Sequence, residues 1–203
     1  EGIEIIGEKA FADNETIVTM ILPNSIKIIE DEAFSDCIML QKINLPQNIN
    51  YIGKSAFANC VKLIKVELPQ NIDTINKSTF SRCQSLSDVI LNDNIKIIDD
   101  LAFYKCKKLK NINIKYGIAY IGELAFYMCN SLQSVNIPET VTFLGNSSFS
   151  SSGVIFAEIG CKSTERDIFS YCKKLKEIVF CEGVEKIGAN FAYDCSNLVN
   201  VKF

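Results

Sequence analysis

The nine cysteines are the residues with the widest possible chemistry, because a thiol can bind a metal, form a disulfide or act as a nucleophile. Metal sites normally use short paired spacings such as C-x-x-C, and the sequence has none. Most of the cysteines instead fall in one regular series, which predicts a ladder of small buried apolar side chains rather than a reactive site. This series runs through Cys37, Cys60, Cys83, Cys106 and Cys129 at intervals of 23 residues, and Cys172 and Cys195 continue it after an interruption.

Cys161 and Cys181 stand outside that series. Each follows a predicted strand, and the two strands belong to successive repeats. A disulfide requires side chains that point toward one another at a short separation, and the spacing here leaves this separation open. Both a disulfide and two separate thiols are compatible with the sequence.

The chain contains no histidine. This excludes a Ser-His or Cys-His nucleophile pair, a histidine general base and a mixed Cys/His zinc site. Catalysis by a pair of carboxylates stays formally possible, but the sequence singles out no such pair. We therefore predict a protein that is not an enzyme and that uses no cofactor and no metal.

The cysteine series is one column of a larger repeat that covers nearly the whole chain. Its pattern is I-x-x-I-G-x-x-A-F-x-x-C-x-x-L-x-x-I-x-L-P, shown most clearly by residues 49–69. A fixed period of this length is typical of solenoids, in which a single unit cannot bury its apolar face but stacked copies can. The phenylalanine column shows the period best: Phe11, Phe34, Phe57, Phe80, Phe103, Phe126 and Phe149.

Each repeat predicts one short strand and one outer turn. The last three residues of L-x-x-I-x-L alternate with period two, which indicates a strand with one buried face. All four prolines come directly after such a strand, where a missing N–H ends the pairing. The A-F-x-x-C segment lacks this alternation, so we expect a short helical or 3-10 turn there, with the phenylalanine pointing inward.

Two places depart from the pattern. Between residues 146 and 169 the period shortens to 20, and the register that buries Val154, Ala157 and Ile159 avoids placing Glu158 in the core. Near the end, Phe191-Ala192 replaces the usual Ala-Phe. Either the chain shifts locally at this point or the Phe191 ring packs differently.

Composition indicates a folded chain and argues against two classes of partner. Of 203 residues, 48% are hydrophobic, and 21 basic and 24 acidic residues are mixed along the sequence for a net charge of −3. This mixture lacks the basic field that attracts nucleic acid or an anionic membrane. No apolar run is long enough to cross a bilayer, and the first residues do not resemble a secretory signal.

The repeated L-x-x-I-x-L-P and I-G-x-x-A-F-x-x-C segments resemble the BspA-type, or treponemal-type, leucine-rich repeat. The resemblance covers residues 3–203. It implies a right-handed leucine-rich-repeat coil with a parallel β-sheet on the concave face. It also implies a surface-displayed or secreted protein that adheres to host or matrix proteins.

We expect residues 1–203 to form a single solenoid of about nine repeats, each of 20–23 residues. Such arrays need polar caps, and neither end of this sequence shows one. We therefore expect further repeats beyond both ends, or association of solenoids end to end.

The strand residues that alternate with the core should face outward and form the surface for a protein partner. Phe156 beside Val179 is the best anchor, because an exposed aromatic ring with a polar rim is the usual form of an interface hot spot. Positions that merely tolerate solvent would show similar residues. The candidate protein-binding residues are Asp88, Ile90, Asn111, Asn113, Ser134, Asn136, Phe156, Glu158, Glu177 and Val179.

A second column precedes the second isoleucine of the repeat. It predicts either a second short strand ladder or a further interaction surface. Its members are Ile5, Ile28, Tyr51, Thr74, Ile97, Tyr120, Phe143 and Lys186.

A structural spacer or an intracellular scaffold is the alternative to a displayed binding protein, because the cysteine series resembles a set of reduced thiols.

Overall fold

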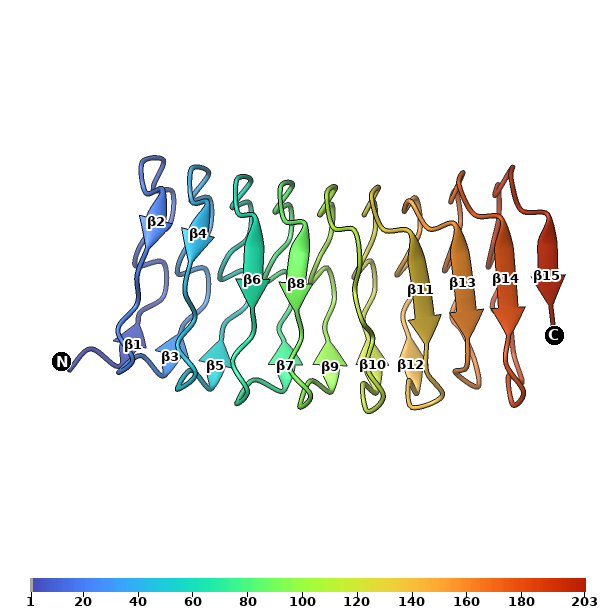
Figure 1. Cartoon of the computed structure of the whole chain (residues 1–203), viewed down its shortest axis with the longest axis horizontal. Coiled ribbons are helices and arrows are strands. Elements are labelled where there is room, and N and C mark those ends of the chain that lie inside the picture. Colours follow the sequence, from blue (N-terminus) through green and yellow to red (C-terminus); the bar gives the residue numbers. More distant parts are fainter. Residues whose placement is uncertain (1) are drawn as a thin grey trace.

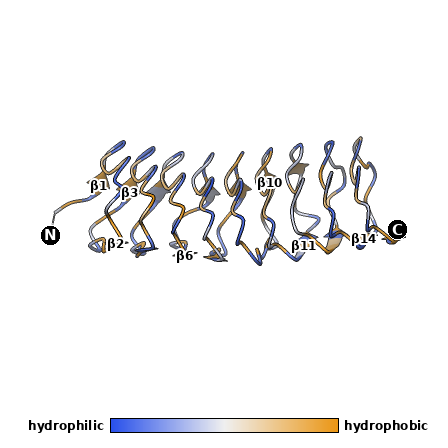
Figure 2. Ribbon diagram, turned by 90° about the horizontal axis from the view of Figure 1, so that it is seen from above, coloured by the Kyte–Doolittle hydropathy of each residue, from blue (hydrophilic) through white to orange (hydrophobic). Residues whose placement is uncertain are grey.

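The computed structural model describes residues 2–203 as one stack of coils along a single long axis (Figure 1). Successive coils lie side by side, and all the recorded strand pairs are parallel. Each coil contributes up to two short strands, so the molecule carries two rows of strands. Seen from above, β2, β6, β11 and β14 lie along one long side of the stack, and β1, β3 and β10 are set back from it (Figure 2). This confirms a β-solenoid.

The front row consists of the strands predicted from L-x-x-I-x-L. They are β2 (Thr19–Met20), β4 (Lys42–Ile43), β6 (Lys65–Glu67), β8 (Asp88–Ile90), β11 (Ser134–Ile137), β13 (Phe156–Ile159), β14 (Glu177–Phe180) and β15 (Asn200–Lys202). The rear row confirms the second ladder. It comprises β1 (Ile5–Ile6), β3 (Ile28–Ile29), β5 (Tyr51–Ile52), β7 (Thr74–Ile75), β9 (Ile97–Ile98), β10 (Tyr120–Ile121) and β12 (Phe143–Leu144).

The irregular repeat adopts the register that buries its apolar residues. Ala157 in β13 pairs with Val135 in β11 and with Ile178 in β14. Val154, Ala157 and Ile159 are fully buried, as predicted. The free-energy cost of burying the Glu158 carboxylate therefore predicts the correct register for this repeat.

The expected helical turns are absent from residues 2–203, and that prediction was wrong. Two residues of each outer turn have left-handed backbone conformations, for example Ser55 with φ 54° and Asn59 with φ 57°. A right-handed helix cannot include such residues. Hydrogen bonds within the turn, such as Ala58 N to Ser55 O at 2.9 Å, alternate with bonds to the next coil, such as Phe57 N to Thr79 O at 2.9 Å. Each outer turn is therefore hydrogen-bonded both within itself and to the next coil of the stack.

The core is a set of side-chain columns that run the length of the solenoid. Phenylalanine rings of neighbouring coils stack with centroids 4.9–5.6 Å apart from Phe11 through Phe169. Isoleucine, leucine and cysteine columns are buried beside them. Offset stacking of aromatic rings adds to the apolar area that they remove from water.

Phe191 breaks the column without shifting the chain. Phe169 N donates to Phe191 O, as Phe57 N donates to Thr79 O, so Phe191 occupies the position usually held by alanine. Its ring is 7% exposed and meets Phe169 edge-on, at an interplanar angle of 71°. Of the two alternatives, the different packing of the ring is confirmed.

Candidate functional site

The strands of the front row carry all the predicted binding residues except Asn111 and Asn113. Their neighbours in the strands, such as Val89, Val135 and Ile178, point into the core. The predicted residues are exposed, apart from Glu158, Glu177 and Val179, which are half-buried. This placement follows from the alternation of side chains along a strand.

Around Phe156 the front row brings together the residues predicted as an anchor and its rim. Phe156 lies opposite Ser134 on one side and Glu177 on the other, and Glu158 lies between Asn136 and Val179. The Phe156 side chain is 36% exposed, so its ring is only partly offered to a partner.

The carboxylates of this rim, Glu158 and Glu177, accept hydrogen bonds from side chains of neighbouring coils. Asn136 Nδ2 donates to Glu158 Oε2 at 2.7 Å. Lys202 Nζ donates to Glu177 Oε1 at 2.5 Å. The rim is therefore held in one arrangement by contacts between neighbouring coils.

Asn111 and Asn113 differ from the other predicted residues, because residues 109–115 form no strand. Ile112 and Ile114 between them are nonetheless buried. The sequence prediction of a strand was wrong here, although the predicted core side was right. The front sheet is consequently interrupted between β8 and β11.

A second interruption lies between β4 and β6, which are not hydrogen-bonded to each other. Ile64 N still donates to Gln41 O at 3.3 Å just before the strands, which then diverge. A groove of about 740 Å³ occupies the front face here. It is lined by Thr19, Met20, Ile21, Gln41, Lys42, Ile43, Asn44, Leu45, Gln47, Ile64, Lys65 and Glu67.

Sequence reasoning missed this groove. Ile21 and Ile64 are 82% and 46% exposed, although each is a large apolar residue. Ile64 was a weak signal, because the equivalent positions hold polar residues in five other repeats, such as Gln41 and Ser87, but apolar ones at Val18, Ile155 and Val199. Only the geometry shows that the two isoleucines border one hollow.

The cysteine column makes a ladder of its own. Cys60 Sγ donates to Phe34 O at 3.1 Å, and Cys83 Sγ donates to Phe57 O at 3.0 Å. Equivalent bonds form at Cys37, Cys106, Cys129, Cys172 and Cys195. Each thiol thereby donates a second hydrogen bond to a carbonyl of the preceding coil that also accepts a backbone N–H, as Phe34 O does from Cys37 N at 3.2 Å.

The buried thiols are protonated and unreactive. Burial raises the pKa of the Cys83 and Cys106 thiols well above the ordinary value of 9.0, and it raises that of Cys172 to about 12. Since the thiolate is the nucleophile and metal ligand, these residues are poorly suited to either task.

Cys161 and Cys181 are free thiols in the structure, so of the two possibilities it contains the unbonded one. Cys181 Sγ lies 3.7 Å from Glu158 Oε1. Partial burial and the nearby Glu158 carboxylate both raise the pKa of this thiol.

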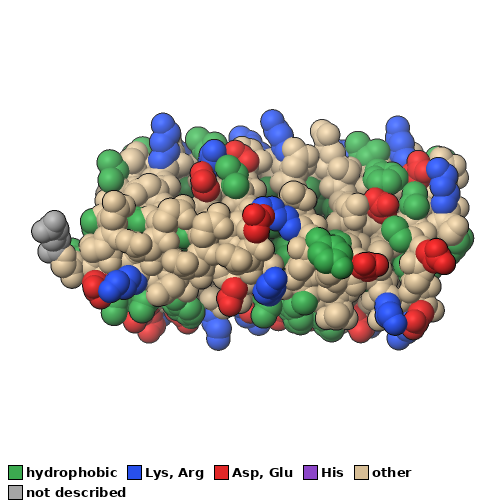
Figure 3. Space-filling model, turned by 60° about the horizontal axis from the view of Figure 1, so that its bottom comes forward, with side chains coloured by type: hydrophobic (Ala, Val, Ile, Leu, Met, Phe, Trp, Pro, Cys, Tyr) green, Lys and Arg blue, Asp and Glu red, His purple; other side chains and the backbone are tan. Residues whose placement is uncertain are grey.

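The rear column forms the predicted second ladder. Its residues pair in register in two groups, which are Ile5, Ile28 and Tyr51, and Thr74, Ile97, Tyr120 and Phe143. Tyr120 and Phe143 stack with centroids 4.7 Å apart. In the space-filling view of the lower side, hydrophobic side chains appear as separate groups between charged ones (Figure 3). An interaction role for this column stays a prediction.

Within residues 2–203 no group of three or more His, Cys, Asp or Glu side chains is placed to hold a metal ion.

The sequence matches a family profile described as "BspA type Leucine rich repeat region (6 copies)" over residues 4–118 and 96–203. This chain belongs to the BspA-type leucine-rich repeat family. Repeat proteins of this kind are generally non-catalytic modules that bind other proteins.

Solved structures show the same fold at low sequence identity. A leucine-rich repeat protein from Bacteroides ovatus is 22% identical, with a TM-score of 0.69 over 97% of this chain and 69% of that one. The T. pallidum leucine-rich repeat protein is 23% identical, with a TM-score of 0.69 over 90% and 78% of the two chains. The pneumococcal vaccine antigen PcpA is 18% identical, with a TM-score of 0.61 over 99% and 56%. No curated protein matches the sequence.

No helix among the described residues is long and apolar enough to span a bilayer.

Proposed function

We propose that this BspA-type repeat is a non-catalytic, adhesin-like module that binds a host or matrix protein through its front strand face. The observation that carries the proposal is the groove across β2, β4 and β6, which lies at one of the two interruptions of the front sheet and whose lining includes the exposed residues Ile21 and Ile64. Energetically important contacts in protein interfaces concentrate where an apolar side chain of one partner fills a pocket of the other.

The predicted residues around Phe156 extend this surface toward the other end of the sheet. Phe156 and Val179 supply apolar area, and Glu158, Glu177 and Asn136 supply a polar rim. Coil-to-coil contacts hold the rim residues in place, so little conformational entropy is lost when a partner binds. A partner that spans both ends would cover more surface than either patch alone offers.

Display at the cell surface or secretion is the setting in which such a module would meet a host protein. The relative described as a vaccine antigen supports this setting, because an antigen of that kind is accessible to antibodies. Fractionation of cells that express the full-length protein, with protease treatment of intact cells, would test it. Detection only in a protease-resistant internal fraction would contradict it.

Binding itself is tested with the purified chain over a panel of immobilised extracellular-matrix proteins. We expect saturable binding to at least one of them. A chain that acts only as a spacer would show linear, non-saturable retention on every surface, and that result would overturn the proposal. The free thiols make an intracellular scaffold the alternative to be considered in that case, since reduced cysteines persist in reducing compartments.

A further inference from the structure

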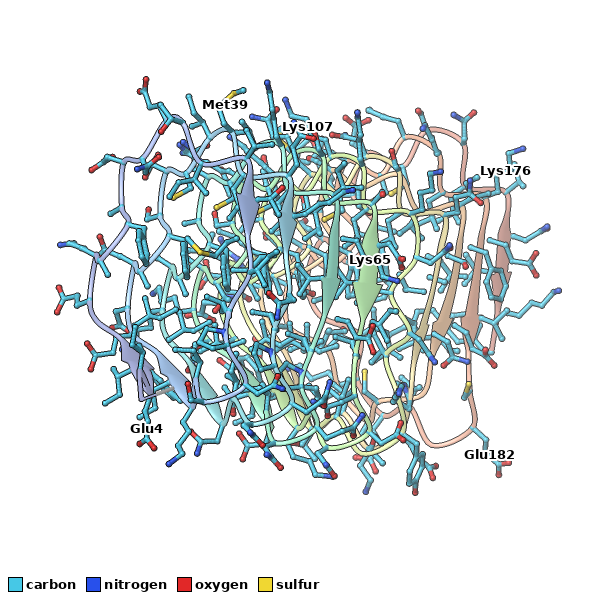
Figure 4. The ribbon with its side chains drawn as sticks, turned by 60° about the vertical axis from the view of Figure 1, so that its left-hand side comes forward. Glu4, Met39, Lys65, Lys107, Lys176 and Glu182 are labelled. Atoms are coloured by element: carbon cyan, nitrogen blue, oxygen red, sulfur yellow. The ribbon has the colours of Figure 1, made fainter. Side chains whose placement is uncertain are left out.

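The upper edge of the solenoid gathers positive charge that is scattered in the sequence. We define this edge as the turn that contains the cysteine-column position and leads into the front strand in five successive coils, comprising residues 81–87, 104–110, 127–133, 150–155 and 170–176. Figure 4 shows Lys107 and Lys176 on this rim. The edge contains no Asp or Glu, and its cations are Arg82, Lys105, Lys107, Lys108, Lys110, Lys173, Lys174 and Lys176.

Backbone hydrogen bonds place these segments directly beside one another. Lys105 N donates to Tyr127 O at 2.8 Å, and Ser131 N donates to Lys107 O at 3.1 Å. Gln133 N donates to Lys110 O at 3.3 Å. Residues more than 20 positions apart therefore form one continuous strip.

A shortened turn joins the two groups of cations. Three positions separate Cys129 from Leu132, but only two separate Ser152 from Val154. Gly153 allows this tight turn, because a Cβ at its position would lie 2.1 Å from Asn130 O. Lys174 Nζ reaches across the shortened turn and donates to Asn130 O at 3.4 Å.

Most of this charge is not neutralised. Among residues 2–203 the only ion pair made by an upper-edge cation is Lys173 with Asp194, at 2.6 Å. Lys105 lies over the Tyr104 ring, 4.9 Å from its centroid. The nearest strand carboxylates are engaged elsewhere, Asp88 with Lys65 at 3.7 Å and Glu177 with Lys202 at 2.5 Å.

Neutral hydrogen-bonding groups fill the spaces between the cations. Gln84, Ser85, Asn130, Ser131 and Gln133 all lie on the edge. Their amides and hydroxyls can both donate to and accept from sugar hydroxyls. A strip that combines ammonium groups with such side chains suits a polymer that carries both anionic groups and hydroxyls.

Other polyanions fit less well. A protein partner needs apolar or aromatic anchors, and the upper edge exposes two large hydrophobic side chains, Ile155 at 39% and Tyr171 at 49%, whereas residues 81–87, 104–110 and 127–133 expose none. Single-stranded nucleic acid stacks its bases on open aromatic rings, whereas Tyr104 and Tyr127 stack on each other with centroids 5.4 Å apart and Tyr171 meets Tyr193 edge-on at 5.6 Å. We propose that the upper edge binds an anionic polysaccharide that carries sulfate or carboxylate groups.

The test uses isothermal titration of the full chain with heparin as the sulfated probe and hyaluronan as the carboxylated probe. The edge variant combines K107Q, K108Q and K110Q, and the matched control combines K27Q, K54Q and K96Q, three lysines away from both the edge and the front groove. Both change the net charge from −3 to −6. We expect the edge variant to bind roughly tenfold to a hundredfold more weakly, and the control to bind within about twofold of wild type.

The corresponding lysine-to-arginine triple variant should retain binding, because it keeps the charge. Circular dichroism melting of each variant would separate loss of binding from loss of folding. Sulfated and carboxylated probes distinguish the two sources of anionic charge, and binding of either supports the proposal. Equal weakening in the edge and control variants, tighter binding of polyglutamate or single-stranded DNA, or no saturable binding at physiological salt would overturn it.

Discussion

At the scale of single residues, each column of the core places the same type of buried side chain in contact from coil to coil. Phe80 is fully buried and contacts Phe57 and Phe103 on its two sides, whereas Phe11 is 37% exposed and stacks on Phe34 alone. The same residue type therefore contributes differently according to its place in the column. Large-to-small substitution in a close-packed core costs the transfer free energy and leaves a cavity.

We predict that F80A lowers the free energy of unfolding by about 3–5 kcal/mol. F11A should cost less than half as much, because water already reaches that ring. Urea denaturation monitored by circular dichroism would measure both. Equal losses at the two positions would show that the column does not behave as one stacked core.

The cysteine column predicts a specific sensitivity to alkaline pH. Burial raises the pKa of the Cys172 thiol from 9.0 to about 12, so above pH 9 the unfolded chain releases a proton that the folded chain retains. The stabilisation is complete below pH 9 and is lost as the pH rises toward 12. We expect Cys172 to contribute a decline of about 1.4 kcal/mol per pH unit in the free energy of unfolding over this window.

Urea denaturation at pH 8, 9.5 and 10.5 would measure that decline. The C172A variant serves as the control, since it should fall less steeply with pH than wild type even if it is less stable at pH 8. Parallel curves for the two proteins would contradict the assignment.

At the scale of elements, the front strands could be predicted from the sequence, apart from the one expected at residues 109–115, and the outer turns could not. Alternation in segments such as Lys65-Val66-Glu67 reports a strand directly, because only one side of it is buried. The outer turns instead depend on left-handed residues that the sequence does not mark with glycine. Leu101 and Leu124 occupy such positions, where their side chains are disfavoured locally. Hydrogen bonds to the next coil outweigh that preference.

This explanation predicts the effect of substitution at Ser55, whose φ is 54°. Glycine tolerates the left-handed region, whereas a β-branched residue is strained there. S55V should therefore be about 1–2 kcal/mol less stable than S55G.

Lys65, in β6, provides the matched position. K65V should be at least as stable as K65G there, because β-branched residues favour strands and glycine weakens them. Thermal unfolding of the four variants would compare them. The same ranking of valine and glycine at both sites would contradict the role of the left-handed turn.

At the scale of the whole molecule, the repeat period predicts the stack, its core columns and the outward side of the front strands. The two features that break the regular surface were not predictable in this way. The groove depends on the divergence of β4 from β6, and the upper edge depends on which segments become neighbours. The linear sequence shows a near balance of 21 basic and 24 acidic residues. In the fold, the upper edge gathers basic residues without any acidic ones.

In the proposed function the front face recognises the partner, and the columns beneath it stabilise the stack. Ile21 lies beside β2, at one end of that face, and Phe156 lies in β13, toward the other end; their side chains are 82% and 36% exposed. Tyr116 is 74% exposed but lies in the turn after residues 109–115, outside the front strands. It therefore offers an equivalent change of an exposed apolar residue to a charge away from the proposed surface.

The most direct test is the affinity for whichever matrix protein binds saturably, measured by surface plasmon resonance for wild type, the I21E/F156E variant and Y116E. We predict that I21E/F156E weakens binding by at least about a hundredfold, because charge replaces two interface anchors, and that Y116E stays within about twofold of wild type. Unchanged affinity in I21E/F156E, with the variant still folded, would contradict recognition through the front strand face.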